Sequence, residues 1–221
     1  MFEIDGLTKT YNRSRQQVHA LRNISLKIDA GSFVTVTGPS GSGKTTLLLS
    51  LGGLIHPSAG VVKHGDMNLY DLSASRLAEF RNRTIGFVLQ TFNLVPYLTA
   101  VENVMLPMLP QRRNGTDPKP RAIELLDQLG LADRRDFLPR ELSVGQQQRV
   151  AIARALGNEP EVILADEPTG NLDPALAAEI LDVLGDLNKS QGKTVVMVTH
   201  SPQAAARAGT VLKLTDGMLV S

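Results

Sequence analysis

The stretch Gly38-Pro-Ser-Gly-Ser-Gly-Lys-Thr45 decides the fold, because it fits the phosphate-binding pattern G-x-x-x-x-G-K-S/T without a mismatch. Before it, Phe33–Thr37 is a β-branched run that predicts a buried strand. After it, Thr46–Leu51 predicts a helix. Glycines let a loop in this context curl, so that successive backbone N–H groups point at phosphate oxygens and the helix N-terminus adds partial positive charge.

The loop itself supplies the candidate phosphate ligands. Lys44 can reach the outer phosphates of a nucleotide, and the Thr45 hydroxyl can ligate Mg²⁺. The alternative is a Gly/Ser-rich turn with a surface lysine, which the flanking strand and helix disfavour. We expect the nucleotide to contact Gly38, Pro39, Ser40, Gly41, Ser42, Gly43, Lys44, Thr45 and Thr46.

Composition excludes several other classes of protein. The chain has 221 residues, 42% hydrophobic content and a net charge of +1, which fits one α/β domain and argues against nucleic acid as a partner. The absence of cysteine excludes disulfides and cysteine-ligated metals. We expect no signal peptide, and the apolar run Leu47–Ile55 is too short to span a bilayer.

The order of the remaining segments predicts an α/β fold. After residue 33, strands alternate with helices, which predicts a mostly parallel core sheet. Before it, Phe2–Leu7 predicts an edge strand, Tyr11 falls in a polar loop, and Val18–Ile28 alternates as a half-buried antiparallel strand. Further strands are expected at 61–63, 85–90, 161–165 and 194–198, a final hairpin at 211–220, and helices at 73–82, 99–106, 121–129, 133–137, 144–156, 174–189 and 202–208.

We expect a single domain over residues 1–221, with a smaller part inserted into it. Residues 1–91 and 159–221 would form the core with its antiparallel β layer. Residues 92–158 contain mostly helical patterns and predict a helical subdomain, with an exposed linker at 110–120.

Polar residues follow three of the predicted strands. Asp166 and Glu167 end an apolar strand where ligands bind in open α/β sheets, so Asp166 is the candidate Mg²⁺ ligand and Glu167 the candidate base that activates water. An exposed acidic strand end is the alternative. Gln90 and His200 end two other strands, and a γ-phosphate contact fits His200, although a lone histidine there is more often structural.

Leu142-Ser-Val-Gly-Gln-Gln-Gln-Arg149 opens a helix that Ser143 can cap, and on its own this stretch predicts an ordinary capped helix. Together with the phosphate loop, Gln90, Leu164–Asp173 and His200, in that order and spacing, it resembles the ATP-binding subunit of ATP-binding-cassette (ABC) transporters over essentially the whole chain. The resemblance implies an ATPase that uses ATP and Mg²⁺.

The resemblance also assigns roles that the residues alone do not. It implies that Tyr11 stacks on adenine and that Ser143, Val144, Gly145 and Gln146 form a signature segment contacting ATP on a second copy, in a head-to-tail dimer. Asp173 would couple the two sites. Glu167, Gln90 and His200 form the expected catalytic set, and Thr45, Gln90 and Asp166 the metal set. The family usually has Gly-Gly after the serine, where this chain has Val144-Gly145.

Two stretches, Gly86–Val104 and Ala165–Asp173, are similar to the lipoprotein-releasing (LolD-like) and macrolide-exporting (MacB-like) ATPases. This similarity implies a cytoplasmic protein held at the inner face of the cell membrane by an integral membrane permease, which docks near residues 90–107. The cargo would be a lipoprotein, a peptide or a drug-like molecule. An ABC ATPase of a non-transport membrane complex in cell division or signalling is the alternative, and the sequence does not separate the two.

Overall fold

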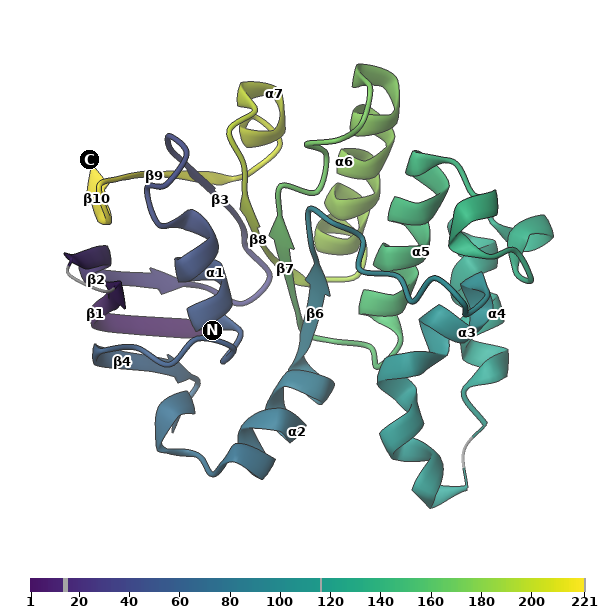
Figure 1. The fold of residues 1–221 in the computed structure, drawn as a ribbon, viewed down its shortest axis with the longest axis horizontal. Helices are drawn as coiled ribbons and strands as arrows, with labels where there is room; N and C mark the ends of the chain where they lie inside the picture. The colour runs from purple at the N-terminus through teal and green to yellow at the C-terminus, as the bar shows by residue number, and fades with distance from the viewer. Residues whose placement is uncertain (14–15, 116, 221) are drawn as a thin grey trace.

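The computed structural model describes residues 1–13, 16–115 and 117–220. It has a six-stranded sheet at its centre, a four-stranded sheet at one end and a group of helices at the other (Figure 1). This arrangement confirms the predicted α/β class with a mostly parallel core sheet and an antiparallel β layer.

The six-stranded sheet has the order β10-β9-β3-β8-β7-β6. The pairs β3/β8, β3/β9, β7/β8 and β6/β7 are parallel, and only the β9–β10 hairpin is antiparallel within this sheet. Its strands are β3 (Phe33–Thr37), β6 (Ile85–Val88), β7 (Val162–Asp166), β8 (Thr194–Val198), β9 (Thr210–Thr215) and β10 (Met218–Val220).

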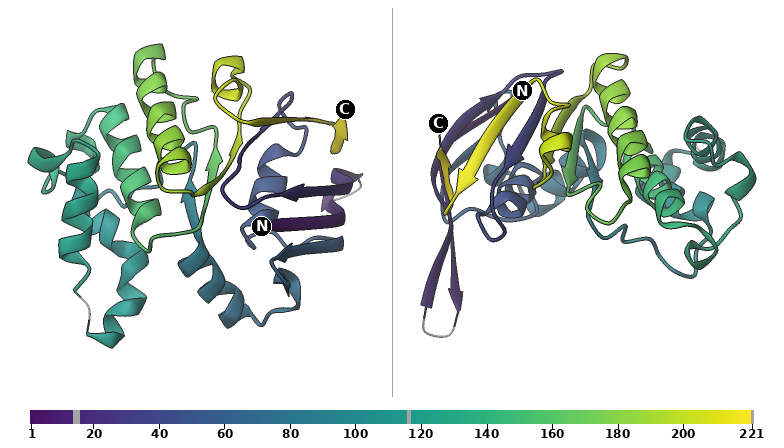
Figure 2. Two further views of the ribbon diagram at one scale, coloured as in Figure 1. Left: turned by 180° about the vertical axis from the view of Figure 1, so that it is seen from behind. Right: turned by 90° about the horizontal axis from the view of Figure 1, so that it is seen from above.

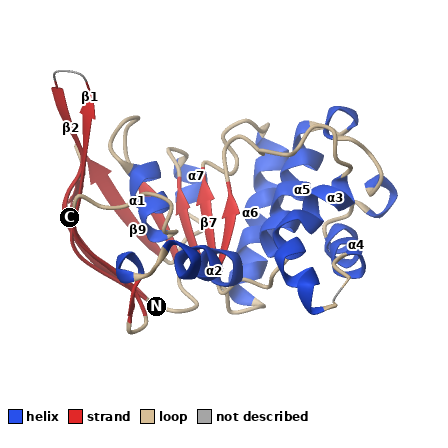
Figure 3. Ribbon diagram, turned by 60° about the horizontal axis from the view of Figure 1, so that its bottom comes forward, coloured by secondary structure: helices blue, strands red, loops and turns tan. Residues whose placement is uncertain are grey.

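The four-stranded sheet is antiparallel and has the order β2-β1-β4-β5. Its strands are β1 (Phe2–Arg13), β2 (Gln16–Ile28), β4 (Ala59–His64) and β5 (Met67–Asn68). Two predictions were wrong here. β1 lies between β2 and β4 and is not an edge strand, and Tyr11 pairs with Val18 inside β1 instead of lying in a loop. The β1–β2 hairpin extends beyond the rest of the sheet as an exposed ribbon (Figure 3). Its sequence is therefore polar and lacks the apolar alternation that predicts a strand.

The helices agree with the predicted segments apart from their ends. They are α1 (Lys44–Leu51), α2 (Ala74–Thr84), α3 (Ala100–Met105), α4 (Lys119–Gln128), α5 (Val144–Leu156), α6 (Pro174–Lys189) and α7 (Pro202–Ala205), with 3₁₀ helices at Leu69–Asp71, Leu106–Asn114, Ala132–Arg134 and Pro139–Glu141. α3, α4 and α5 gather at the end of the molecule opposite the antiparallel strands (Figure 2).

Three predicted boundaries were wrong. The expected linker at 110–120 is 3₁₀ helix up to Asn114 and the start of α4 from Lys119. β6 ends at Val88, so Gln90 lies in the loop beyond it, and α7 stops at Ala205, well before residue 208. Local composition places element ends poorly, since turn residues such as Pro110 are also tolerated in 3₁₀ helices.

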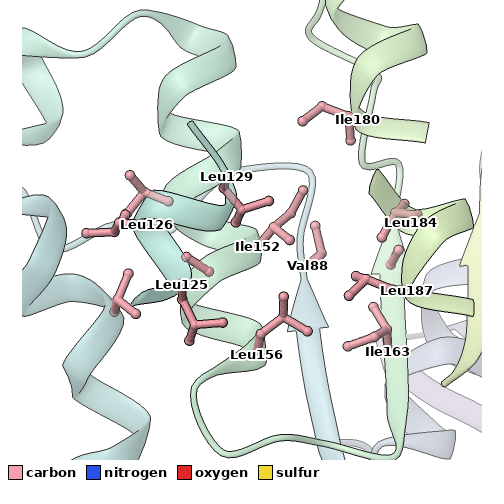
Figure 4. Packing of buried hydrophobic residues seen from close by; sticks show 14 of the residues in the cluster. Val88, Leu125, Leu126, Leu129, Ile152, Leu156, Ile163, Ile180, Leu184 and Leu187 are labelled. Carbon is pink, nitrogen blue, oxygen red and sulfur yellow. The ribbon is translucent and has the colours of Figure 1, made fainter. Parts of the chain in front are cut away.

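The central strands are buried on both faces, as expected of parallel strands covered on each side. Ile163 and Ala165 of β7 pack into the cluster that also contains Leu125, Ile152 and Leu184 from the helices (Figure 4). Val162 and Leu164 face the opposite cluster, formed with α1 and the antiparallel sheet. Two cores therefore hold the sheet rigidly, and the carboxyl ends of β3, β7 and β8 meet at one edge.

Candidate active site

The loop after β3 is held in a shape that requires glycine. Gly43, the residue before α1, has φ +103°, and a Cβ there would lie 2.2 Å from the carbonyl oxygen of Ala20. A Cβ at Gly38 would lie 2.0 Å from the carbonyl oxygen of Leu214. No side chain caps the start of α1, so its first N–H groups are available to a ligand.

A cavity of about 610 Å³ opens at this helix start. Lys44 is nearly buried there, and its ammonium donates to the carbonyl oxygens of Gly38 (2.9 Å) and Pro39 (3.0 Å). A buried cation whose hydrogen bonds go to neutral carbonyls, beside free backbone N–H groups, favours an anionic ligand such as a phosphate. The lining residues are Ala20, Ser40, Gly41, Gly43, Lys44, Thr45, Thr46, Gln90, Glu167 and His200.

Asp166 ends β7 next to the phosphate loop, and its carboxylate accepts a 3.1 Å hydrogen bond from the Thr45 hydroxyl. Burial raises the pKa of Asp166, an effect that the Thr45 bond opposes and the charge of Glu167 adds to. A cation would therefore stabilise the ionised form of Asp166. Within the residues that the structure describes, no three His, Cys, Asp or Glu side chains cluster to hold a metal alone. A hydroxyl and one carboxylate beside a phosphate site suit Mg²⁺, which binds proteins through few carboxylates and substrate phosphates.

Glu167 has a backbone that few non-glycine residues adopt, with φ +45°. Its carboxylate accepts hydrogen bonds from the Thr199 hydroxyl (3.1 Å) and the His200 backbone N–H (3.4 Å), and lies 2.9 Å from His200 Nδ1. The carboxylate is thus held at the cavity wall from the end of β8.

Thr199 and Ala20 belong to the site, although the sequence did not single them out. Thr199 could have been predicted from the sequence, because its hydroxyl lies immediately before His200 at a strand end. Ala20 lies on β2 and reaches the loop only through the packing of the two sheets. Gln90 lines the cavity from the loop after β6, and its carbonyl accepts from Asn171 (3.2 Å).

Ten of the predicted site residues do not line this cavity. Gly38, Pro39 and Ser42 lie in the phosphate loop and Asp166 bonds to Thr45 beside it, whereas the other six lie elsewhere. Tyr11 lies on β1, where the Lys9 ammonium is 5.1 Å from its ring centroid. Asp173 caps α6 by accepting from the N–H groups of Ala175 (3.0 Å) and Leu176 (3.1 Å). The other four, Ser143 to Gln146, form the start of α5.

Side chains of α5 itself cap the start of this helix. The Ser143 hydroxyl accepts from the Gln146 N–H (3.3 Å), and the Gln146 side chain accepts from the Ser143 N–H (2.9 Å). Val144 is 45% exposed. A Cβ at Gly145 would lie 3.0 Å from a methyl carbon of Leu176, so Gly145 also allows α5 to pack closely against α6.

Comparisons with known proteins agree with this geometry. Residues 21–170 match the family model described as "ABC transporter". The chain is 43% identical to the uncharacterized ABC transporter ATP-binding protein YvrO of Bacillus subtilis over 220 residues, covering 100% of this chain and 96% of that protein. It is 44% identical to the lipoprotein-releasing system ATP-binding protein LolD of Syntrophus aciditrophicus, covering 100% and 99%.

Two further similarities concern a longer relative and a solved structure. The macrolide export ATP-binding/permease protein MacB of Syntrophobacter fumaroxidans is 45% identical, and this chain spans 31% of its length. A dimeric structure of the ATP-binding cassette MJ0796 of Methanocaldococcus jannaschii, described as a post-hydrolysis state bound to ADP and phosphate, matches with a TM-score of 0.94 and 42% identity, covering 100% of this chain and 97% of that one.

Residues 1–13, 16–115 and 117–220 include no helix with the length and apolar character of a membrane span. The phosphate loop, the carboxylates at the end of β7 and the full-length similarity to known cassettes agree with one another. The chain therefore belongs to the ABC transporter ATP-binding proteins, of the LolD and MacB type, and is an ATPase.

Proposed function

We propose that this ATPase powers an integral membrane permease that exports or extracts lipoprotein, peptide or drug-like cargo. The observation that carries the proposal is the match over 99% of the length of a lipoprotein-releasing system ATP-binding protein. The protein would sit in the cytoplasm at the inner membrane face, held there by the permease.

Within each subunit, Lys44 and the loop N–H groups bind the ATP phosphates, and Glu167 takes a proton from the attacking water. His200 and Gln90 contact the γ-phosphate and the water. Thr45, Gln90 and Asp166 would hold Mg²⁺, which would supply positive charge beside the phosphates. The 3.1 Å bond from Thr45 to Asp166 supports this ligand set, because it brings two oxygen ligands together beside Lys44.

ATP would bind between two copies arranged head to tail. Tyr11 would stack on the adenine, the signature segment Ser143–Gln146 would contact the nucleotide of the other copy, and Asp173 would couple the two sites. The dimeric state named for the MJ0796 structure supports this arrangement. So does the exposed position of Val144, away from the cavity of its own chain.

The same proposal assigns a different function to each part of the chain. Residues 1–91 and 159–221 form the nucleotide-binding core, and residues 92–158 form a helical subdomain that carries the signature. The packing of α3, α4 and α5 around Leu125 and Ile152 supports a subdomain with its own apolar contacts.

We place the permease contact near residues 90–107, where a groove of about 490 Å³ has mainly apolar walls. Leu54 and Leu106 line it, and the adjoining loop exposes 78% of Tyr97. Arg154 of α5 donates to the carbonyl oxygens of Phe92 and Asn93, both at 2.6 Å, which ties this loop to the helix that carries the signature. Nucleotide state and docking would then influence each other reciprocally.

The test is co-purification with a candidate permease encoded beside this chain. Leu54→Glu and Tyr97→Glu should each break the complex and leave the ATPase rate of the isolated protein unchanged. Leu94 is a poorer probe, because it packs against the core cluster. Val211→Glu is the matched control, since Val211 on β9 is 52% exposed, close to the 50% of Leu54. Complexes that survive both substitutions would rule out this surface.

A further inference from the structure

One buried side chain connects the signature helix to the catalytic loop. Gln148 of α5 is 1% exposed, and its side-chain N–H donates to the carbonyl oxygen of Pro168 at 2.7 Å. The side-chain oxygen of Gln148 is buried without a hydrogen-bond partner among the described residues. A buried amide whose N–H is hydrogen-bonded but whose oxygen is not destabilises a core, so we expect Gln148 to have a role beyond packing.

The acceptor lies directly after the proposed base. Glu167, with φ +45°, is followed by Pro168, and a residue before proline strongly prefers extended backbone. Such strained backbone persists only where the surroundings hold it in place.

Three hydrogen bonds hold this turn. The Glu167 N–H donates to the carbonyl of Val198 (2.9 Å), and the Gly170 N–H donates to the carbonyl of Glu167 (3.1 Å). Both are backbone bonds. The third is the bond from Gln148 to the carbonyl oxygen of Pro168, one residue after Glu167, and its donor comes from a different part of the fold.

α5 therefore contacts two loops of the catalytic site in its own chain. Gln148 bonds to the loop after β7, and Arg154, about two turns further along, bonds to the loop after Gln90. The start of the same helix carries Ser143. A displacement of α5 would therefore act on the backbone beside Glu167 through this bond.

We propose that Gln148 is a positioning residue for ATP hydrolysis: its bond to Pro168 sets the Glu167 carboxylate and links that setting to the position of α5. The proposal rests on the proposed role of Glu167 as the base. The effect should appear in the rate of hydrolysis and not in nucleotide binding, because Gln148 does not line the nucleotide cavity. A small misplacement of a reacting group can cost up to about 100-fold in rate.

The experiment compares Gln148→Met, which keeps the shape but loses the donor, with the wild type. We expect kcat for ATP to fall about tenfold or more and KM to stay within about twofold. Gln148→Asn, which keeps the amide but shortens its reach, should behave in the same way and serves if the Met variant does not fold. Asn188→Leu is the control, since Asn188 also bonds backbone carbonyls, those of Gly31 and Lys193, but lies away from the site.

A second measurement tells whether Gln148→Met acts on the position of Glu167 or instead damages the signature segment. In a Glu167→Gln background, where bound ATP is no longer removed, Gln148→Met should still form an ATP-held dimer by light scattering. Loss of that dimer, or a wild-type kcat in both Gln148 variants, would overturn the inference. Normal turnover by Glu167→Gln alone would instead overturn the assignment of the base, so the two failures are distinguishable.

Discussion

The starts of α1 and α5 are both helix N-termini that we assign to ATP, yet they are built in opposite ways. Gly43 before α1 is left-handed and no side chain caps the helix. Ser143 before α5 caps its helix in a reciprocal pair with Gln146. The first lies on a cavity of about 610 Å³, whereas the second is an exposed surface of its own chain.

The difference shows which of the two helix starts has backbone N–H groups free to bind phosphate within a single chain. A helix start leaves backbone N–H groups without partners inside the helix, and these attract anions. α1 keeps its groups free and adds Lys44, so it is prepared for phosphate before any partner arrives. α5 uses its Ser143 and Gln146 N–H groups internally, so the proposed contact with the nucleotide of a second chain would have to replace these capping bonds.

The largest effect should follow from removing the positive charge of Lys44 at the uncapped start of α1. Lys44→Ala should weaken MgATP binding roughly 10–100-fold, because charge-assisted hydrogen bonds to phosphate are lost. Equilibrium binding of a fluorescent ATP analogue would measure this. Lys193→Ala is the control, since Lys193 also donates to a backbone carbonyl, that of Pro160 (2.8 Å), but far from the cavity. Equal losses in both variants would contradict the assignment of Lys44.

A negative charge at the capped start of α5 should prevent dimerisation without changing nucleotide affinity. Val144→Asp would place a carboxylate against phosphate and should abolish ATP-dependent dimerisation in the Glu167→Gln background, while nucleotide affinity of the monomer stays unchanged. Val144→Gly should leave ATPase activity intact or raise it, because it relaxes a β-branched position. Val211→Asp controls for added charge at an exposed valine. A Val144→Asp protein that dimerises normally would show that α5 does not face nucleotide.

Removal of the cap at α5 should give a smaller effect that separates stability from assembly. Ser143→Ala should cost about 1 kcal/mol of stability and weaken the ATP-held dimer by about tenfold. Ser73→Ala makes the matched change, because Ser73 caps α2 through the Arg76 N–H. If both variants lower Tm alike but only Ser143→Ala loses the dimer, the hydroxyl of Ser143 binds the partner's nucleotide. Equal dimerisation would limit Ser143 to capping.

The smallest effect concerns a third helix start, where α3 has a capping pair with a charged member. Glu102 accepts from Thr99, and these hydrogen bonds lower the pKa of the Glu102 carboxyl. Because the folded pKa is depressed, the pair stabilises the fold above the unfolded pKa and loses that contribution as pH falls through the folded pKa. The Tm of Glu102→Gln should therefore lie slightly below that of the wild type at pH 7 and converge with it in acid. The neutral Ser143–Gln146 pair should show no such pH dependence.

Much of the fold could be predicted because its signals are local. Phe33–Thr37 and the glycine pattern after it specify strand, turn and helix within a few residues, and Ser143 caps its helix as expected. Polar residues after strands predicted the cavity wall, since the ends of parallel strands share one edge. The strand at Phe2–Leu7 was predicted, but its edge position and the loop at Tyr11 were wrong, because the order of strands in a sheet depends on pairing between distant segments.

The sequence by itself determined that this chain binds a nucleotide phosphate, which loop does so, and which carboxylates stand at the next strand end, because those features depend on residues close together in the chain. Only the tertiary structure decided that Thr199 holds Glu167, that the backbone at Glu167 is strained, and that Gln148 bonds to Pro168. These contacts join residues 20 or more positions apart, and their geometry is set by how α5 and the two cores pack against the sheet.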